Sequence, residues 1–161
     1  MKQTVLTLII ALIASASVSV FAQTTVATMK TAQTTGEVTI AVAWSTASGT
    51  GKILANDTEM TNNPDYESTW DNTYVDVPVP ANHTIELIAE GDAQLLWLSC
   101  NYSRLTNLDL SKCTALTKLS CSNNQLTDLD LSKCTALKTL YASNQLTILP
   151  MKEISGEWSI D

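Results

Sequence analysis

The fold is decided by residues 108–136, in which the block LDLSKCTA at 108–115 returns at 129–136. Residues 116–128 separate the two copies, and the first twelve of them, 116–127, read LTKLSCSNNQLT. The same 21-residue spacing relates leucines across the second half of the chain, in two columns. The columns are Leu95, Leu116 and Leu137, and Leu98, Leu119 and Leu140. Self-similarity at such a fixed period predicts a repeat architecture.

The residue types within the repeat have a physical reason. One coil cannot bury its apolar face alone, so leucines at one position of successive coils stack into a shared core. Asn124, in the leucine-rich-repeat motif LxxLxCxxNxL, is expected to turn inward and bond backbone groups where the strand bends. The first coil has Ser103 at this position, and the third is one residue shorter, which places Asn144 in a tighter turn. We predict a mainly β fold with a short solenoid of 21-residue coils.

Residues 23–94 indicate a small antiparallel β module in front of the repeats. Apolar side chains occupy every second position of 37–44, which is typical of a half-buried strand. Further strands are predicted at 52–55, 73–80 and 83–89. Pro78 and Pro80 cannot donate to a β ladder, so the strand at 73–80 is expected at a sheet edge.

The two ends of the chain are expected to lie outside these two regions. Residues 1–22 combine Lys2, an apolar run and a small-residue ending at Ala22, the pattern of a cleaved signal peptide. We therefore predict a secreted or surface-exposed protein, with no later run of membrane length. The predicted organisation is a signal at 1–22, the β module at 23–94, repeats at 95–150 and a tail at 151–161. For the tail, a partial cap and the start of a further domain are both open.

The charge balance excludes several kinds of partner. The chain of 161 residues carries sixteen Asp plus Glu against nine Lys plus Arg, a formal net charge of −7. Nucleic acid and anionic membranes are therefore poor partners, because no basic stripe is available to neutralise phosphates. The single histidine, His83, is expected at the surface or a sheet edge, and no hydrolase, metalloprotease or phosphate-loop motif is present. We expect no enzyme activity, no catalytic residue and no cofactor.

The cysteines follow the repeat period, Cys100 with Cys121 and Cys113 with Cys134. An even number in an exported protein is compatible with disulfides. However, side chains stacked in parallel register point the same way, which opposes disulfide geometry. We expect reduced, buried thiols, and no metal site, because neither a CxxC pair nor a nearby histidine is present.

An acidic loop at 56–76 has enough oxygen ligands for a calcium ion but lacks regular EF-hand spacing. A solvated loop is the preferred interpretation. Its acidic residues are Asp57, Glu59, Asp65, Glu67, Asp71 and Asp76.

The candidate binding surface is the concave face of the repeats. Side chains alternate across a strand, so the residues between the buried leucines point outward. They are Trp97, Ser99, Asn101, Lys118, Ser120, Ser122, Thr139, Tyr141 and Ser143. Aromatic residues are typical binding hot spots, and serines allow close approach. Trp97 could instead cover the join between module and repeats, so Tyr141 is the stronger candidate.

From Glu90 to Pro150 the chain resembles the internalin-like leucine-rich-repeat proteins exported by gut and oral anaerobic bacteria. The resemblance rests on LxCxxNQLT at 119–127 and covers a little over a third of the chain. It implies a secreted or surface module that binds a protein of a host or neighbouring cell. The alternative is a carbohydrate-binding accessory protein, whose site would be Trp97 with Tyr141 or the acidic loop.

Overall fold

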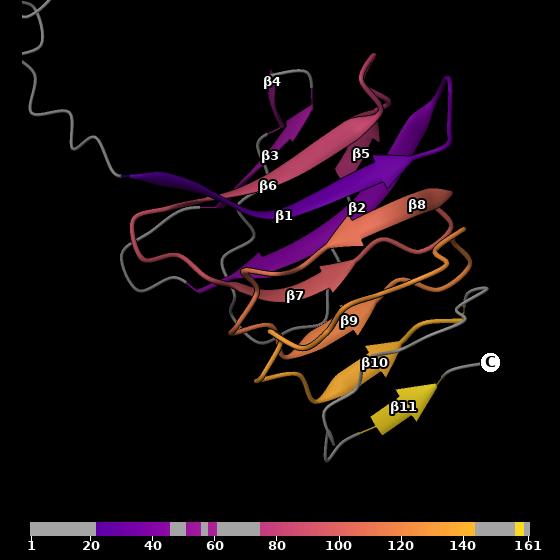
Figure 1. Cartoon of the computed structure of the whole chain (residues 1–161). Coiled ribbons are helices and arrows are strands. Elements are labelled where there is room, and N and C mark those ends of the chain that lie inside the picture. The colour runs from indigo at the N-terminus through magenta and orange to yellow at the C-terminus, as the bar shows by residue number, and fades with distance from the viewer. Residues whose placement is uncertain (1–21, 46–50, 56–57, 61–74, 144–156, 160–161) are drawn as a thin grey trace, which may run out of the picture.

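The computed structural model describes residues 22–45, 51–55, 58–60, 75–143 and 157–159 (Figure 1). The predicted signal up to residue 21, most of the acidic loop and Asn144 lie outside them. All regular structure in the described residues is strand, which confirms the prediction of a mainly β protein. The same residues contain no helix that could span a bilayer.

The strands form two sheets. The five-stranded sheet has the order β4-β3-β6-β1-β8, and the six-stranded sheet has the order β11-β10-β9-β7-β2-β5. The bounds are β1 Gln23–Thr31, β2 Glu37–Trp44, β3 Gly51–Ala55, β4 Thr58–Met60, β5 Val75–Pro78, β6 Thr84–Glu90, β7 Leu95–Ser99, β8 Leu105–Asp109, β9 Lys118–Ser120, β10 Thr139–Tyr141 and β11 Glu157–Ser159.

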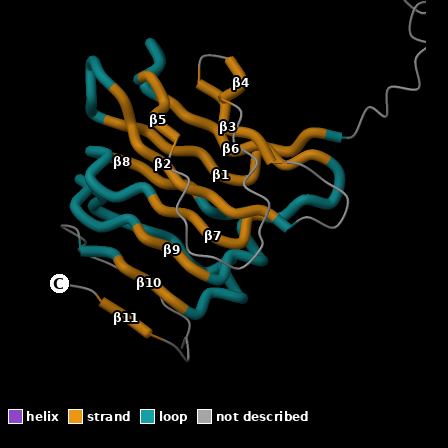
Figure 2. The backbone as a smooth tube through the Cα atoms, turned by 180° about the vertical axis from the view of Figure 1, so that it is seen from behind, coloured by secondary structure: helices purple, strands orange, loops and turns teal. Residues whose placement is uncertain are grey.

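The 21-residue period of the sequence is the register of a parallel ladder. Leu98 of β7 pairs with Leu119 of β9, which pairs with Leu140 of β10. All three leucines are buried. β11 pairs in parallel with the other side of β10 and so covers that edge (Figure 2).

These strands do not form the predicted arrangement, a solenoid that follows a separate β module. Instead, each sheet combines strands from both halves of the chain. β2 pairs antiparallel with β7, and β1 pairs antiparallel with β8. These pairings have a physical reason: they hydrogen-bond the backbone edges that an isolated first coil would leave open.

The two sheets face each other and share one core. Seen from opposite sides, Figures 1 and 2 place β1, β6 and β8 in one layer and β2, β5 and β7 in the other. Met29, Ile40 and Leu87 are fully buried in the same hydrophobic cluster as the repeat leucines. Gly51 lies against the indole of Trp44 so closely that a Cβ there would collide with the ring.

The strand predictions for the first half are largely confirmed. The strand at 37–44 is β2, and those at 52–55 and 83–89 correspond to β3 and β6. The predicted strand at 73–80 is β5, at the edge of its sheet as its prolines require. Two strands of this half were not predicted: β1, which lies between β6 and β8, and β4, which lies within the stretch expected to be an acidic loop.

Candidate functional site

The candidate site is the face of the six-stranded sheet that points away from the core, called the outer face below. The side chains predicted to face inward are buried: Leu98, Cys100, Leu119, Cys121, Leu140 and Ala142. Of the nine predicted binding residues, all but one are partly exposed. The exception is Ser99, which is 4% exposed.

A side-chain network centred on Asn101 joins the first two coils. The Asn101 Nδ2 group donates to Ser120 Oγ at 2.9 Å and, more weakly, to Ser99 Oγ at 3.4 Å. Asn101 Oδ1 accepts from Ser120 Oγ and from the backbone N–H of Ser122, at 3.0 and 2.7 Å. Ser122 Oγ in turn accepts from the Ser143 N–H at 3.1 Å. Four of the predicted binding residues, Asn101, Ser120, Ser122 and Ser143, therefore link neighbouring coils, and Ser99 adds a weaker bond within the first coil.

Lys118 lies between the two aromatic residues of the outer face. Its Nζ is 6.0 Å from the Trp97 ring centroid and 5.8 Å from the Tyr141 ring centroid. A cation at this distance is attracted by the negative face of an aromatic ring. The three side chains, one from each successive coil, form the aromatic–lysine cluster.

The part of the outer face nearest β2 is less accessible. Trp97 on β7 pairs with Ala43 on β2, and Ser99 pairs with Ala41. Ala41 and Ala43 are buried although their positions alternate with the core-facing residues of β2. Trp97 Nε1 is buried as well and has no hydrogen-bond partner among the described residues. Trp97 thus lies at the join between β2 and the repeats, the alternative role considered for it.

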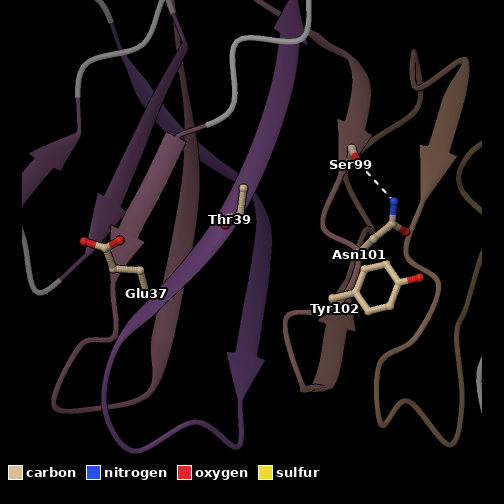
Figure 3. A pocket seen from close by; sticks show the side chains of 5 residues that line it. All are labelled: Glu37, Thr39, Ser99, Asn101 and Tyr102. Carbon is tan, nitrogen blue, oxygen red and sulfur yellow. Dashed lines mark hydrogen bonds between the residues drawn. The ribbon is translucent and has the colours of Figure 1, made fainter.

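A polar pocket of about 330 Å³ opens where β2 meets the turn after β7. It is lined by Glu37, Thr39, Ser99, Asn101 and Tyr102. Figure 3 shows Glu37 and Thr39 on one strand, across from the other three residues. Two of the five, Ser99 and Asn101, were predicted as binding residues, whereas Glu37, Thr39 and Tyr102 were missed.

Tyr102 has an unusual combination of exposure and backbone conformation. It is the one large hydrophobic side chain among the described residues that is strongly exposed, at 75%. Its φ is 56°, in the left-handed region, and Asn123, one period later, has φ 57°. Asparagine tolerates this conformation far better than tyrosine. The signal was therefore present in the sequence, as an aromatic residue in a column where the next coil has asparagine.

Asn124 has the inward role predicted for it. Its Oδ1 accepts from the backbone N–H groups of Ser103 and Leu105 at 3.1 and 3.0 Å. Its Nδ2 donates to the carbonyls of Cys100 and Cys121 at 2.9 and 2.8 Å. One amide thus satisfies backbone groups of two successive coils.

Ser103, which replaces the asparagine in the first coil, is also buried. Its Oγ donates to the carbonyl of Asn101 at 3.1 Å and approaches that of Thr39 at 3.4 Å. A hydroxyl therefore takes over part of the role, with fewer bonds than the amide, and ties the first coil to β2.

The four cysteines are free and buried in the structure. Burial raises the pKa of Cys113 to about 12 and that of Cys134 to about 11. Burial also raises the pKa of Cys100 well above its ordinary value. Thiols of this kind are poor nucleophiles and poor metal ligands, because both roles need the thiolate.

The repeated DLS segment makes a turn on the side away from the outer face. Asp109 Oδ1 accepts from the Ser111 N–H at 2.9 Å, and Asp130 Oδ1 accepts from the Ser132 N–H at 2.8 Å. These bonds lower the pKa of both carboxyl groups. Asp128 is exposed and makes only a 3.5 Å contact with the neighbouring Thr127 hydroxyl.

The part of the chain that the structure describes holds no group of three or more histidine, cysteine or acidic residues that could bind a metal. Of the acidic loop, Glu59 forms an ion pair with Lys52 at 3.0 Å, and Asp76 accepts from Thr39 Oγ1 at 2.7 Å. The remaining candidates, Asp57, Asp65, Glu67 and Asp71, lie outside the described residues.

Comparison with known proteins identifies the repeats. Residues 114–153 match the family model described as Leucine Rich repeats (2 copies). No curated protein and no solved structure matches the chain.

Proposed function

We propose, on the premise that residues 114–153 are leucine-rich repeats, that this protein is a non-catalytic binding module that recognises another protein. Repeats of this kind commonly present a strand face to a protein partner. Its partner is a protein of a host or neighbouring cell, and the module is secreted or displayed at the cell surface. The export pattern at residues 1–22 supports the location.

The observation that carries the proposal is the aromatic–lysine cluster. Tyrosine and tryptophan give large contact areas at a small cost in side-chain entropy, and the neighbouring serines let a partner backbone approach. The Lys118 ammonium lies near both rings, which leaves less ring surface for stacking on a sugar. The cluster therefore favours a protein partner over the carbohydrate alternative.

The test is capture on the immobilised protein from surface-protein extracts of bacterial and epithelial cells. A partner is expected to bind the wild type and Asp128→Ala equally, and to bind Tyr141→Ala about 30-fold or more weakly, the size of an interface hot spot. The thermal midpoints of the three proteins should agree.

Two results would overturn the proposal. One is normal capture by Tyr141→Ala together with loss in Glu67→Ala or Asp71→Ala, which would place the site in the acidic loop. The other is specific binding on a glycan array with no protein partner, which would favour the carbohydrate alternative.

A further inference from the structure

We propose that the polar pocket beside β2 binds a positively charged side chain, a guanidinium or ammonium group, presented by the partner protein. This inference rests on the proposed function, since the cation is expected to belong to that partner. It adds a second anchor point to the outer face, separate from the aromatic–lysine cluster.

The charge of the pocket favours a cation. Glu37 is its charged lining residue, and it is exposed. Among the described residues the Glu37 carboxylate has no hydrogen-bond or ion-pair partner, and Asp76 lies next to the pocket through its bond to Thr39. A carboxylate with open acceptor positions pairs well with a guanidinium group.

Two of the remaining lining groups have no hydrogen left to donate to a neutral polar ligand. Asn101 uses both amide hydrogens and its oxygen within the network that joins the coils. The Thr39 hydroxyl donates its hydrogen to Asp76. A sugar needs several free donors as well as acceptors, whereas a cation needs acceptors only.

Tyr102 supplies the aromatic surface. Its backbone is held in the left-handed conformation, with its N–H donating to the carbonyl of Ser122 at 3.1 Å. The exposed ring stands at the pocket beside Asn101 (Figure 3). A planar guanidinium group can stack on such a ring. A volume of about 330 Å³ has room for a guanidinium-bearing side chain.

The test uses Nα-acetyl-arginine amide as the probe and the matching citrulline derivative as its uncharged control. Binding to the purified protein is followed by amide chemical shifts in NMR spectra. We expect the arginine probe to shift the amides of Glu37, Thr39 and Tyr102, and the citrulline probe to bind about fivefold or more weakly. Methyl glucoside should not shift these amides.

Two variants locate the effect. Glu37→Gln keeps the shape of the side chain and removes its charge. Tyr102→Asn introduces the residue type found at the same repeat position of the next coil, where the backbone has nearly the same φ. Both are expected to fold and to weaken arginine binding about fivefold, whereas Asp128→Ala should not. Equal binding of arginine and citrulline, tighter binding of methyl glucoside, or unchanged affinity in Glu37→Gln would overturn the inference. None of these results would affect the capture of a partner protein through Tyr141. Failure of this inference is therefore distinguishable from failure of the proposed function.

Discussion

Two asparagines join neighbouring coils from opposite sides of the strands. Asn124 points inward and bonds backbone groups of the first and second coils. Asn101 lies on the outer face and bonds the Ser120 side chain and the Ser122 backbone N–H of the second coil. An amide suits both places because it donates and accepts at once. The coils are therefore connected through side chains as well as through the parallel ladder.

The loss of the inward amide should be costly. Asn124→Ala leaves two N–H groups and two carbonyls in a partly buried place without their partner, and each such group costs about 1–3 kcal/mol when water cannot replace it. We expect the free energy of unfolding to fall by about 2–4 kcal/mol, measured by urea denaturation. The exposed neighbour in Gln125→Ala is the matched control and should change it by less than about 0.5 kcal/mol. Equal effects of the two changes would contradict the inward role.

The buried thiols predict a pH dependence. The folded-state pKa of Cys113 is raised from the ordinary 9.0 to about 12, so the neutral thiol is favoured in the folded protein. The resulting stabilisation is complete below the pKa of the unfolded thiol. It is lost as the pH rises through the folded values, about 11 for Cys134 and about 12 for Cys113. We expect the free energy of unfolding to decrease as the pH rises from about 9 to about 12.

Thiol labelling at a milder pH tests the burial of the thiols, on which this pH dependence rests. At about pH 8 the native protein should react with an aromatic disulfide reagent only as fast as it unfolds, because the reagent needs an accessible thiolate. In denaturant all four cysteines should react at once. Rapid reaction of the native protein, without unfolding, would show that the thiols are not buried as described.

At the element scale, β9 is the central strand of the repeat ladder and its three residues have distinct roles. Lys118 belongs to the aromatic–lysine cluster, Leu119 is buried, and Ser120 bonds Asn101. A three-residue strand has little stability of its own, so the stacked leucine column must hold it in place.

Leu119→Ala should therefore destabilise the protein by about 2–5 kcal/mol, through lost apolar contacts and the cavity that remains. Thermal and urea unfolding measure the effect. The exposed Lys138→Ala is the matched control, with less than about 0.5 kcal/mol expected. Ser120→Ala is unsuitable as a control because it breaks the Asn101 network. A small effect of Leu119→Ala would mean that the leucine column does not stabilise the ladder.

Elements with a local pattern could be predicted from the sequence, and elements defined by distant pairing could not. The apolar alternation of Glu37–Trp44 and the 21-residue leucine spacing are local, and both appear in the structure as expected. β1 and β8 stabilise each other across about 80 residues of chain, and neither has a strong period of its own. The outer-face residues of the repeats followed from the same alternation.

The pocket depended on a contact that no spacing contains. Glu37 and Thr39 come from β2, and they reach Tyr102 because β2 pairs with β7. The sequence pattern placed these strands in separate units. It therefore gave no reason to expect that the two sides of the pocket lie close together.

At the scale of the whole molecule, the shared sheets predict one cooperative unfolding transition. β2 joins the repeat ladder through β7, β1 joins β8, and the inward side chains form one cluster. Neither half can lose its structure without exposing the apolar side chains of the other. A small domain built in this way is expected to unfold in two states.

Probes already present in the chain can follow each half separately. The four cysteines all lie between residues 100 and 134 and report on the repeats. Trp44 reports on β2 once the other three tryptophans, Trp70, Trp97 and Trp158, are replaced by phenylalanine. In a urea titration, cysteine accessibility, tryptophan fluorescence and far-UV circular dichroism should give the same midpoint. Ile85→Ala in β6 and Leu119→Ala in β9 should each shift all three curves together, by about 2–5 kcal/mol in unfolding free energy. Leu119→Ala could instead expose the cysteines while the fluorescence transition stays in place. In that case the repeats would be an independent unit. The pairing of β2 with β7 would then be a contact between two folded parts rather than the centre of one sheet.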